Sequence, residues 1–507
     1  MERNNKIKKI SDLVETLQKK RFGKKIVLCH GVFDLLHIGH IKYFENAKTA
    51  GDILIVTVTP DRYVNKGPHR PAFSEQLRCE AIAALAVVDY VALNEWPTAV
   101  ETIQILKPDI YAKGSEYKKS ENDLTGMIVE EERALQEIGG SMLFTEDIVF
   151  SSSRLINKNF SNFPEETRKF LAEFSNRYSS EEVLQFLKQA EKLKVLVIGE
   201  TIIDEYNYCD PIGMTTKDPI IAVKYISQEK FAGGVLAAAN HLANFCHMVD
   251  IITLLGEFET DEAFVRENLN KKINPFFLYK RSSPTIVKRR FIDNYLTQKL
   301  FELHEINDSE LDREQETLLN EIFREKIPNY DIIIVIDYGH GMLTKELIKT
   351  ICDNAKFLAV NTQSNAGNRG FNVISKYSKA DFISLNRSEL NLEERDRHCG
   401  IKESIAHVSR KISCPKILIT MGSFGNIYYD VHEGFVETPA FATQVLDRMG
   451  AGDAVLSLSS LCAFQNAPKD VVGFIANAVA SQAVATVGHR TSIESVPLYK
   501  HITALMK

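Results

Sequence analysis

Two stretches of the chain alternate short apolar runs with amphipathic helical patterns. In the first, residues 24–156, apolar positions recur at helical spacing near 39–50, 74–86, 98–106 and 126–138. The strand-like runs that accompany them are Ile26–Cys29, Ile53–Val58, Tyr90–Leu93, Ile110–Ala112 and Met142–Phe144. Regular alternation of this kind predicts a parallel sheet with helices on both faces. Ligands of such sheets bind beyond the carboxyl ends of the strands.

A second alternation begins at Lys194–Gly199 and continues to the end of the chain. Its further strands are expected at Val249–Leu254, Ile332–Ile336, Phe357–Val360, Phe382–Leu385 and Ile417–Met421. Two strand-rich excursions, Asp204–Tyr225 and Phe276–Leu303, predict a small β lid. Between the alternations the chain is polar and helical, and Ser179 and Glu182 have the spacing of a capping box. The predicted organisation is a domain at 1–156, a helical linker at 157–192 and a second α/β domain at 193–507.

Composition and charge narrow the function classes. A chain of 507 residues is too long for one core, and its 44% apolar and 25% charged content is that of a globular protein. A net charge of −6 argues against a nucleic-acid partner. The eight cysteines are scattered, which favours a reducing compartment. No apolar run reaches the roughly 18 residues of a membrane helix, and residues 1–25 lack a signal core. We therefore expect a cytoplasmic protein with small-molecule ligands and no membrane partner.

A strand–turn–helix junction at Gly31–His40 carries the first candidate chemistry. His37 and His40 are three residues apart, so both side chains lie on one face of the first helical turn. Free N–H groups at that helix end attract anions, and Gly39 lets a phosphate approach the backbone. Nucleotidyl transfer builds negative charge on phosphate oxygens and needs fixed positive donors. A histidine pair alone is more often structural, so the assignment depends on the segments that accompany it.

Those segments resemble the cytidylyltransferase-like nucleotidyltransferases, whose mark is His-x-Gly-His. The resemblance covers about residues 24–157 and is closest to the transferase part of the bifunctional heptose-phosphate kinase/adenylyltransferases. It implies a Rossmann-like domain in which His37 and His40 are catalytic. The nucleotide-binding residues that it implies are Gly31, Phe33, Asp34, Gly39, Lys66, Arg78, Lys113, Ser151, Ser152 and Ser153.

Two points stay open for this domain. Asp34 either contributes to the nucleotide site or only fixes the turn by bonding backbone amides. Lys113–Tyr117 and Ser151–Arg154 depart from the family's Lys-Gly-Gly-Asp-Tyr and Ser-Thr-Thr, which leaves the sugar unspecified. The motifs do not choose between ATP and CTP as the nucleotidyl donor.

A second glycine turn before a helix occurs at Gly450-Ala451-Gly452-Asp453. Small residues there let backbone amides reach a transferring phosphoryl group. Asp453, at the helix entry, is placed to take the proton from an attacking sugar hydroxyl. Gly-x-Gly-Asp by itself is weak evidence, because glycine turns before helices are common.

The surrounding segments resemble the ribokinase-like (PfkB) carbohydrate kinases over about residues 192–500. The resemblance implies Asp453 as the catalytic residue, substrate contacts at Asp204, Gly233 and Gly234, and Glu389 as a ligand for Mg²⁺. The nucleotide-binding residues that it implies are Asn386, Glu389, Thr420, Gly422, Gly425, Gly450, Ala451, Gly452 and Asn477. Departures from the family pattern, which indicate a changed sugar pocket, occur at Glu200, Ala237, Asn361-Thr362-Gln363 and Arg448-Met449.

Together the two resemblances imply a bifunctional transferase that makes an ADP- or CDP-linked sugar, heptose-like or polyol, for surface polysaccharide synthesis. ATP would serve the kinase, ATP or CTP the nucleotidyltransferase, and Mg²⁺ both. The domain order is reversed relative to the heptose enzymes. Lys288, Arg289 and Arg290 either bind a phosphate already on the sugar or form a solvated strand face. The alternatives are a transferase with an inactive kinase-like domain, and a nucleotide-sensing scaffold. The resemblance also implies a homodimer through the kinase lid.

Overall fold

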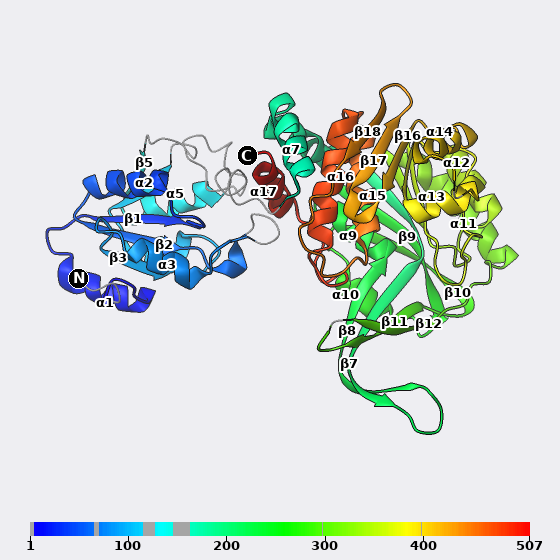
Figure 1. The fold of residues 1–507 in the computed structure, drawn as a ribbon, viewed down its shortest axis with the longest axis horizontal. Coiled ribbons are helices and arrows are strands. Elements are labelled where there is room, and N and C mark those ends of the chain that lie inside the picture. Colours follow the sequence, from blue (N-terminus) through cyan, green and yellow to red (C-terminus); the bar gives the residue numbers. More distant parts are fainter. Residues whose placement is uncertain (1–4, 65–69, 115–126, 146–162, 297, 397) are drawn as a thin grey trace. The chain divides into compact units, whose positions relative to one another are not determined.

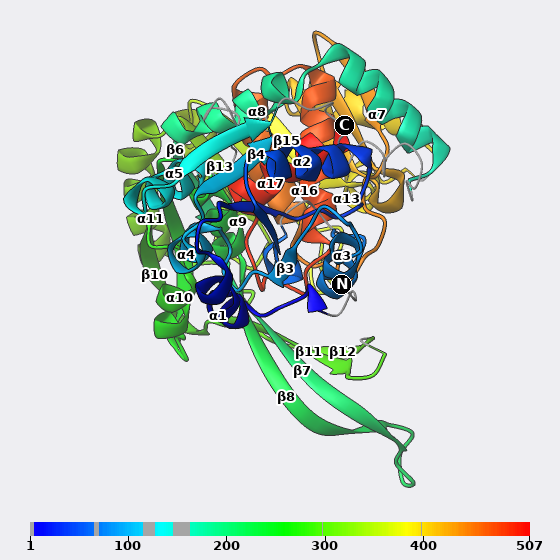
Figure 2. The same cartoon turned by 90° about the vertical axis from the view of Figure 1, so that its left-hand side faces the viewer.

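The computed structural model describes residues 5–64, 70–114, 127–145, 163–296, 298–396 and 398–507. The chain divides into two compact units, Met1–Asn162 with Val496–Lys507, and Phe163–Ser495. Each unit has its own sheet and its own core (Figures 1 and 2). The prediction of two α/β domains is confirmed.

The first unit contains a five-stranded parallel sheet in the order β3-β2-β1-β4-β5. Its strands are β1 (Ile26–Gly31), β2 (Ile53–Val58), β3 (Tyr90–Leu93), β4 (Ile110–Gly114) and β5 (Ser141–Thr145). Its helices are α1 (Ile10–Lys20), α2 (Ile38–Thr49), α3 (Glu75–Ala83), α4 (Val100–Leu106), α5 (Met127–Glu137) and α17 (Ser495–Leu505).

Both faces of this sheet are buried. Successive side chains of a strand point to opposite sides, so each strand contributes to two cores. Ile26 and Leu28 of β1 join the core that α1, α4 and α5 cover. Val27 and Cys29 join the core beneath α2 and α3. Strands buried on two faces read as continuous apolar runs, which is why the sequence predicts them. Because every strand is parallel, all carboxyl ends lie at one edge of the sheet, where α2 begins.

The second unit is built on a nine-stranded sheet in the order β10-β9-β6-β13-β14-β15-β16-β17-β18. The strands from β10 to β16 are parallel, and the last two add antiparallel. The strands are β6 (Lys194–Gly199), β9 (Met248–Phe258), β10 (Ile273–Pro284), β13 (Ile332–Asp337), β14 (Leu358–Thr362), β15 (Phe382–Asn386), β16 (Lys416–Thr420), β17 (Asn426–Asp430) and β18 (Gly434–Thr438).

Helices cover both faces of this sheet. The large apolar core on one face is closed by α11 (Arg313–Lys326), α12 (Lys345–Asn354), α13 (Arg387–Glu394) and α14 (Ile401–Lys411). The other face carries α9 (Val235–Ala243), α15 (Ala451–Phe464) and α16 (Lys469–Ala483), while α10 (Glu262–Asn268) lies by the lid (Figure 1). Helix α15 packs against β13, β14 and β15, so its first turn lies over the centre of the sheet.

A second, four-stranded sheet forms the predicted lid in the order β12-β11-β7-β8. Its strands are β7 (Thr201–Met214), β8 (Ile221–Gly234), β11 (Ile286–Asp293) and β12 (Lys299–Glu305). The β7–β8 hairpin extends away from the rest of its unit in both views (Figures 1 and 2).

The segment predicted as a linker contains α7 (Glu165–Arg177) and α8 (Ser180–Gln189), which pack within the second unit. The Phe174 ring stacks on Phe474 of α16 with centroids 4.3 Å apart. The predicted capping box starts α8: Glu182 N donates to Ser179 Oγ over 3.3 Å, and Ser179 N donates to Glu182 Oε2 over 2.7 Å.

Candidate functional site

The first site lies where β1 turns into α2. His37 is the N-cap of α2, and its Nδ1 accepts a hydrogen bond from Gly39 N over 3.1 Å. An accepting Nδ1 requires the neutral ring to carry its proton on Nε2, which makes Nε2 a donor. The His40 ring stacks on His37 with centroids 4.0 Å apart. The ring of Phe33, a residue with φ of 49°, makes a T-shaped contact with His40, with centroids 5.3 Å apart. The two predicted histidines therefore lie together at the amino end of a helix.

Asp34 stabilises the turn before this helix. Its buried carboxylate accepts hydrogen bonds from Ala72 N at 2.6 Å and Phe73 N at 3.3 Å, and forms an ion pair with Arg70 at 3.2 Å. The two amides belong to the segment before α3, so Asp34 ties that segment to the turn and does not make the bonds within the turn that the alternative for Asp34 describes. Gly31 lies at the end of β1, where a Cβ would stand 3.0 Å from the Phe33 ring.

Arg78 is engaged by protein groups. Its side chain is 1% exposed. Nε donates to Phe73 O over 3.0 Å, one terminal nitrogen to Val32 O, and the other to Thr59 O at 2.9 Å and Asp61 Oδ1 at 2.5 Å. The guanidinium thus joins α3 to the ends of β1 and β2. A phosphate contact by Arg78 would require it to give up some of these bonds.

Lys113, at the end of β4, forms an ion pair with Glu131 of α5 at 2.9 Å. Burial alone would raise the pKa of Glu131, but Lys113 and His30 lower it below its ordinary value. Burial, reinforced by repulsion from Lys113, lowers the pKa of His30 to about 4, so this ring is neutral near pH 7. Lys66, Ser151, Ser152 and Ser153 lie outside the described residues.

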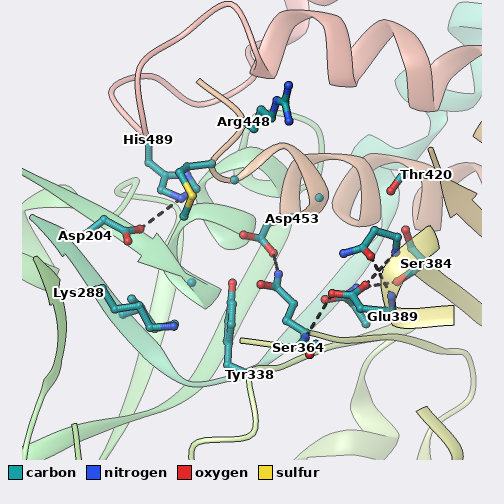
Figure 3. A pocket seen from close by; sticks show the side chains of 18 of the residues that line it. Asp204, Lys288, Tyr338, Ser364, Ser384, Glu389, Thr420, Arg448, Asp453 and His489 are labelled. Carbon is teal, nitrogen blue, oxygen red and sulfur yellow. Dashed lines mark hydrogen bonds and ion pairs between the residues drawn. The ribbon is translucent and has the colours of Figure 1, made fainter. Parts of the chain in front are cut away.

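The second site is a cavity of about 240 Å³ where the lid meets the first turn of α15. Figure 3 shows Asp453 between two groups of side chains, with Asp204, Lys288 and His489 on one side and Glu389 and Thr420 on the other. Helices α13 and α15 and the end of β16 bring Glu389, Asp453 and Thr420 to this cavity, while β7 and β11 bring Asp204 and Lys288 from the lid sheet.

Asp453 lies in the first turn of α15, which begins after Gly450. Burial raises the pKa of its carboxyl to about 7, and the Asp204 carboxylate contributes to the rise. Tyr338 and Gln363 act in the opposite sense, and Gln363 Nε2 donates to Asp453 Oδ1 over 2.6 Å. A carboxylate with a pKa near neutrality can take up a proton from a substrate at ordinary pH.

The glycines around Asp453 keep the cavity open. Gly450 has φ of 74°, and a Cβ there would lie 2.0 Å from His489 Cε1. A Cβ on Gly452 would meet nothing within 4 Å, so its backbone borders open space. Ala451 is the first residue of α15, where backbone N–H groups lack helical partners. These features leave the first turn of α15 open to the cavity beside the Asp453 carboxylate.

The lid supplies charged groups to the same cavity. Asp204 of β7 forms a buried ion pair with Arg290 of β11 and lies 3.6 Å from His489 Nε2. A Cβ on Gly233 would stand 2.1 Å from Asp204 Oδ2, which explains the predicted glycine, and Gly234 with φ of 59° starts α9.

Strand alternation separates the three basic residues of β11. Lys288 and Arg290 line the cavity, whereas Arg289 points to the other face and pairs with Glu205 at 3.1 Å and Glu305 at 2.5 Å. The Lys288 side chain is 7% exposed, and its Nζ lies 5.7 Å above the Tyr338 ring. Burial lowers its pKa. Within the described part of the chain, no ion pair or hydrogen bond reaches this ammonium.

The Asn-x-x-Glu segment at the start of α13 forms a capping box. Asn386 Oδ1 accepts from Glu389 N at 2.9 Å, and Glu389 Oε2 accepts from Asn386 N at 2.8 Å. Glu389 Oε1 also accepts from Ser364 N at 3.3 Å, and burial raises its pKa to about 7. Both residues line the cavity. Among the described residues no group of three or more His, Cys, Asp or Glu side chains could hold a metal ion by itself.

The predicted nucleotide-binding segment begins at Thr420, the last residue of β16, and continues into the turn that follows. Thr420 lines the cavity, and Gly422 and Gly425 have φ of 61° and 90°. A Cβ on Gly425 would lie 2.0 Å from Thr438 O. Asn477 holds the end of β18, donating to Thr438 O at 2.9 Å and Pro439 O at 2.8 Å.

Three cavity residues near Asp453 have no predicted role: Tyr338, Gln363 and His489. Tyr338 and Gln363 follow β13 and β14, so their position after buried parallel strands was a usable signal. His489 lies in the loop after α16, and nothing in the local sequence indicates its approach to Asp204.

Comparison with known proteins places both units in established classes. Residues 192–496 match the pfkB family of carbohydrate kinases, and residues 28–183 match the cytidylyltransferase-like family. Because the first match covers more than half of the chain, the protein belongs to the pfkB family carbohydrate kinases. The predicted combination, with the transferase segment first, is confirmed.

Relatives named bifunctional protein HldE are similar to this chain over part of its length. One from Campylobacter jejuni is 29% identical over 330 residues, 63% of this chain and 67% of the relative, and a second Campylobacter jejuni relative is covered over 64% of its length. One from Helicobacter pylori is 41% identical over 155 residues, 30% of this chain and 31% of the relative. Among solved structures, phosphofructokinase-2 from Escherichia coli in complex with potassium has a TM-score of 0.50 and 13% identity, covering 62% of this chain and all of that one. At this low identity, the similarity to phosphofructokinase-2 shows the fold of the second unit and nothing about its activity.

No helix in the described part of the chain combines the length and apolar character needed to cross a membrane.

Proposed function

We propose that this chain makes a nucleotide-activated sugar or polyol in two steps. In the second unit, Asp453 takes the proton from a sugar hydroxyl, the oxygen forms a bond to the γ-phosphorus of ATP, and ADP leaves. In the first unit, a phosphate oxygen of a sugar phosphate attacks the α-phosphorus of ATP or CTP, and pyrophosphate leaves. The observation that carries the proposal is the cavity that Asp453 and Asp204 line together beside the first turn of α15.

Lys288 supports a sugar phosphate as the substrate of the kinase step. Its buried ammonium lines the cavity and forms no ion pair with a described residue, although the nearby Asp204 carboxylate partly offsets the effect of burial on its pKa. A buried charge without a partner is costly, and a phosphate group on the substrate would neutralise it. Arg290 lies on the same strand face but is already paired with Asp204 and Glu302. Asp204 would then accept from a sugar hydroxyl, as the resemblance implies.

Glu389 suits a magnesium ion that is held jointly by the protein and the substrate phosphates, rather than by protein ligands alone. Mg²⁺ keeps several waters and is usually held by one or two carboxylates together with substrate phosphates. A single buried carboxylate on the cavity wall fits that pattern. When bound, the ion would neutralise the polyphosphate charge. The backbone amides of Asn386 and Ser364 hold the Glu389 carboxylate in the cavity wall.

In the first unit we assign His37 and His40 as the donors that stabilise charge on the phosphate oxygens. Stabilisation of this kind requires groups fixed before the reaction begins. The bond from Gly39 N to His37 Nδ1 holds one ring, and stacking against that ring together with a T-shaped contact with Phe33 holds the other. Burial lowers the pKa of His37, so it donates as the neutral Nε2–H tautomer.

The test is ADP formation by the full chain with ATP, Mg²⁺ and matched panels of sugars and sugar phosphates. Asp453→Asn should abolish ADP formation, and Lys288→Met should raise KM for sugar phosphates at least tenfold without affecting unphosphorylated sugars. Lys217→Met, an exposed lysine of the same lid, is the control. If Asp453→Asn keeps the wild-type rate while pyrophosphate is still released from ATP or CTP, the chain is a nucleotidyltransferase with a structural kinase-like unit.

We further propose that the lid hairpin mediates homodimer formation in the cytoplasm. The outer part of β7–β8 exposes apolar side chains, including Ile212 at 72%, Met214 at 62% and Ile220 at 60%. Exposed apolar patches of this kind mark contact surfaces. All eight cysteines are free, as expected in a reducing compartment. Light scattering should show a dimer for the wild type and a monomer for Ile212→Glu with Ile220→Glu; a monomeric wild type would contradict the proposal.

A further inference from the structure

Gln363 is the closest polar neighbour of Asp453 that the sequence motifs leave without a role. It follows the last residue of β14, and its backbone is held on both sides. Gln363 N donates to Asp337 O over 2.8 Å, and Asn372 Nδ2 donates to Gln363 O over 3.0 Å. From this fixed backbone the side-chain amide reaches Asp453 Oδ1 at 2.6 Å. The contact is therefore built into the end of the strand.

The groups facing Asp453 come from four directions. Tyr338 follows β13, Asp204 comes from the lid, Glu389 from α13 and Gln363 from β14. The basic side chains that line the same cavity are Lys288, Arg290, Arg448 and His489. Within the described residues none of these cations forms an ion pair with Asp453. The donor to its Oδ1 is a neutral amide.

We propose that Gln363 is a positioning residue for phosphoryl transfer, holding Oδ1 of Asp453 so that Oδ2 accepts the proton of the substrate hydroxyl. The inference rests on the proposed role of Asp453 as the base. A neutral donor orients the carboxylate without pairing its charge, so the base keeps its affinity for the proton. A cation at position 363 would pair with the carboxylate and make it a weaker base, whereas an apolar residue would leave Oδ1 without a donor.

These opposite consequences define the experiment. The pH dependence of kcat/KM for ADP formation is measured on the full chain for wild type, Gln363→Leu and Gln363→Lys. Leucine should move the acidic limb of the profile to higher pH by about one to two units, the size expected for losing a hydrogen bond to a charged group. Lysine should move the acidic limb to lower pH. Gln185→Leu, an exposed glutamine of α8, is the control and should leave the profile unchanged.

Shifts in the same direction, or no shift, for the leucine and lysine variants would overturn the positioning role. Asp453→Asn separates this failure from that of the proposed function. If Asp453→Asn remains active, Asp453 is not the base and the proposed function fails first. If it is inactive while the limb stays in place in both Gln363 variants, only the inference on Gln363 fails. Should the lysine variant not fold, Gln363→Asn, which keeps the amide but shortens its reach, should shift the limb upward as leucine does.

Discussion

Arg78 offers a direct test of whether a family arginine here binds nucleotide or holds the fold. The resemblance implies a contact with the triphosphate, yet the structure buries the side chain against the ends of two strands. We consider Arg78→Met, which keeps much of the apolar stem and removes the guanidinium. The substitution leaves Val32 O, Thr59 O and Phe73 O without this donor and breaks the ion pair with Asp61.

The size of the effect follows from these bonds. Hydrogen bonds to charged groups contribute about 1.5–3 kcal/mol each, but those sharing one side chain do not add independently. The acceptors that lose their donor cost about 1–3 kcal/mol each, while Asp61, 39% exposed, can be solvated, so we expect a total loss of about 3 kcal/mol. For a unit of this size, that loss in free energy of unfolding corresponds to a fall in Tm of about 10 °C. Arg78→Lys, which keeps the charge but not the fork of donors, should fall between methionine and wild type.

Calorimetry of the full chain should show the transition of the first unit lowered while that of the second is unchanged. Arg62→Met is the matched control, because Arg62 donates one hydrogen bond to Glu95 O at 3.1 Å near the same strand ends. Pyrophosphate release should survive below the new transition. An unchanged Tm together with lost pyrophosphate release would show that Arg78 acts on the nucleotide and would refute the structural account.

Three further predictions concern the activities of the two candidate sites. His40→Ala should lower pyrophosphate release by roughly 10²–10⁴-fold without changing Tm, as loss of a transition-state donor does; an unchanged rate would remove it from the mechanism. The kcat/KM of the kinase step should fall as pH drops below about 7, because burial raises the pKa of Asp453 to about 7 and only the deprotonated carboxylate accepts a proton; a profile flat between about pH 5 and 8 would contradict this. Gly450→Ala should abolish ADP formation but not pyrophosphate release, since its φ is 74° and the new Cβ would lie 2.0 Å from His489 Cε1; equal losses of both activities would indicate general unfolding instead.

The regular core of each unit could be predicted from the sequence because buried parallel strands are short apolar runs that alternate with helices. The predicted runs at Ile53–Val58 and Ile332–Ile336 correspond to β2 and β13. Strands β17 and β18 had no predicted counterpart. They lie at the end of the sheet, where an antiparallel hairpin leaves a weaker apolar pattern.

Individual roles were harder to predict than elements, because one residue type serves several purposes. Asn386 and Glu389 match a family motif, and in the structure they also cap α13. Asp34 bonds the backbone of the segment before α3, a role that neither of its two sequence alternatives describes. The basic run on β11 was ambiguous until strand alternation turned Lys288 toward the cavity and Arg289 away from it. Spacing along a strand shows which side chains share a face, but not which of its two faces is covered by the rest of the protein.

The sequence by itself determined two α/β units, the glycine turns that open α2 and α15, and the histidines and aspartate beside them, because those features depend on neighbouring residues. Only the tertiary structure decided which groups line the cavity together with Asp453. Gln363, Tyr338, His489 and Lys288 come from separate strands and loops, and their approach depends on how the lid and sheet pack. Burial then sets the proton affinities of these groups, and burial is a property of the packed chain rather than of any segment.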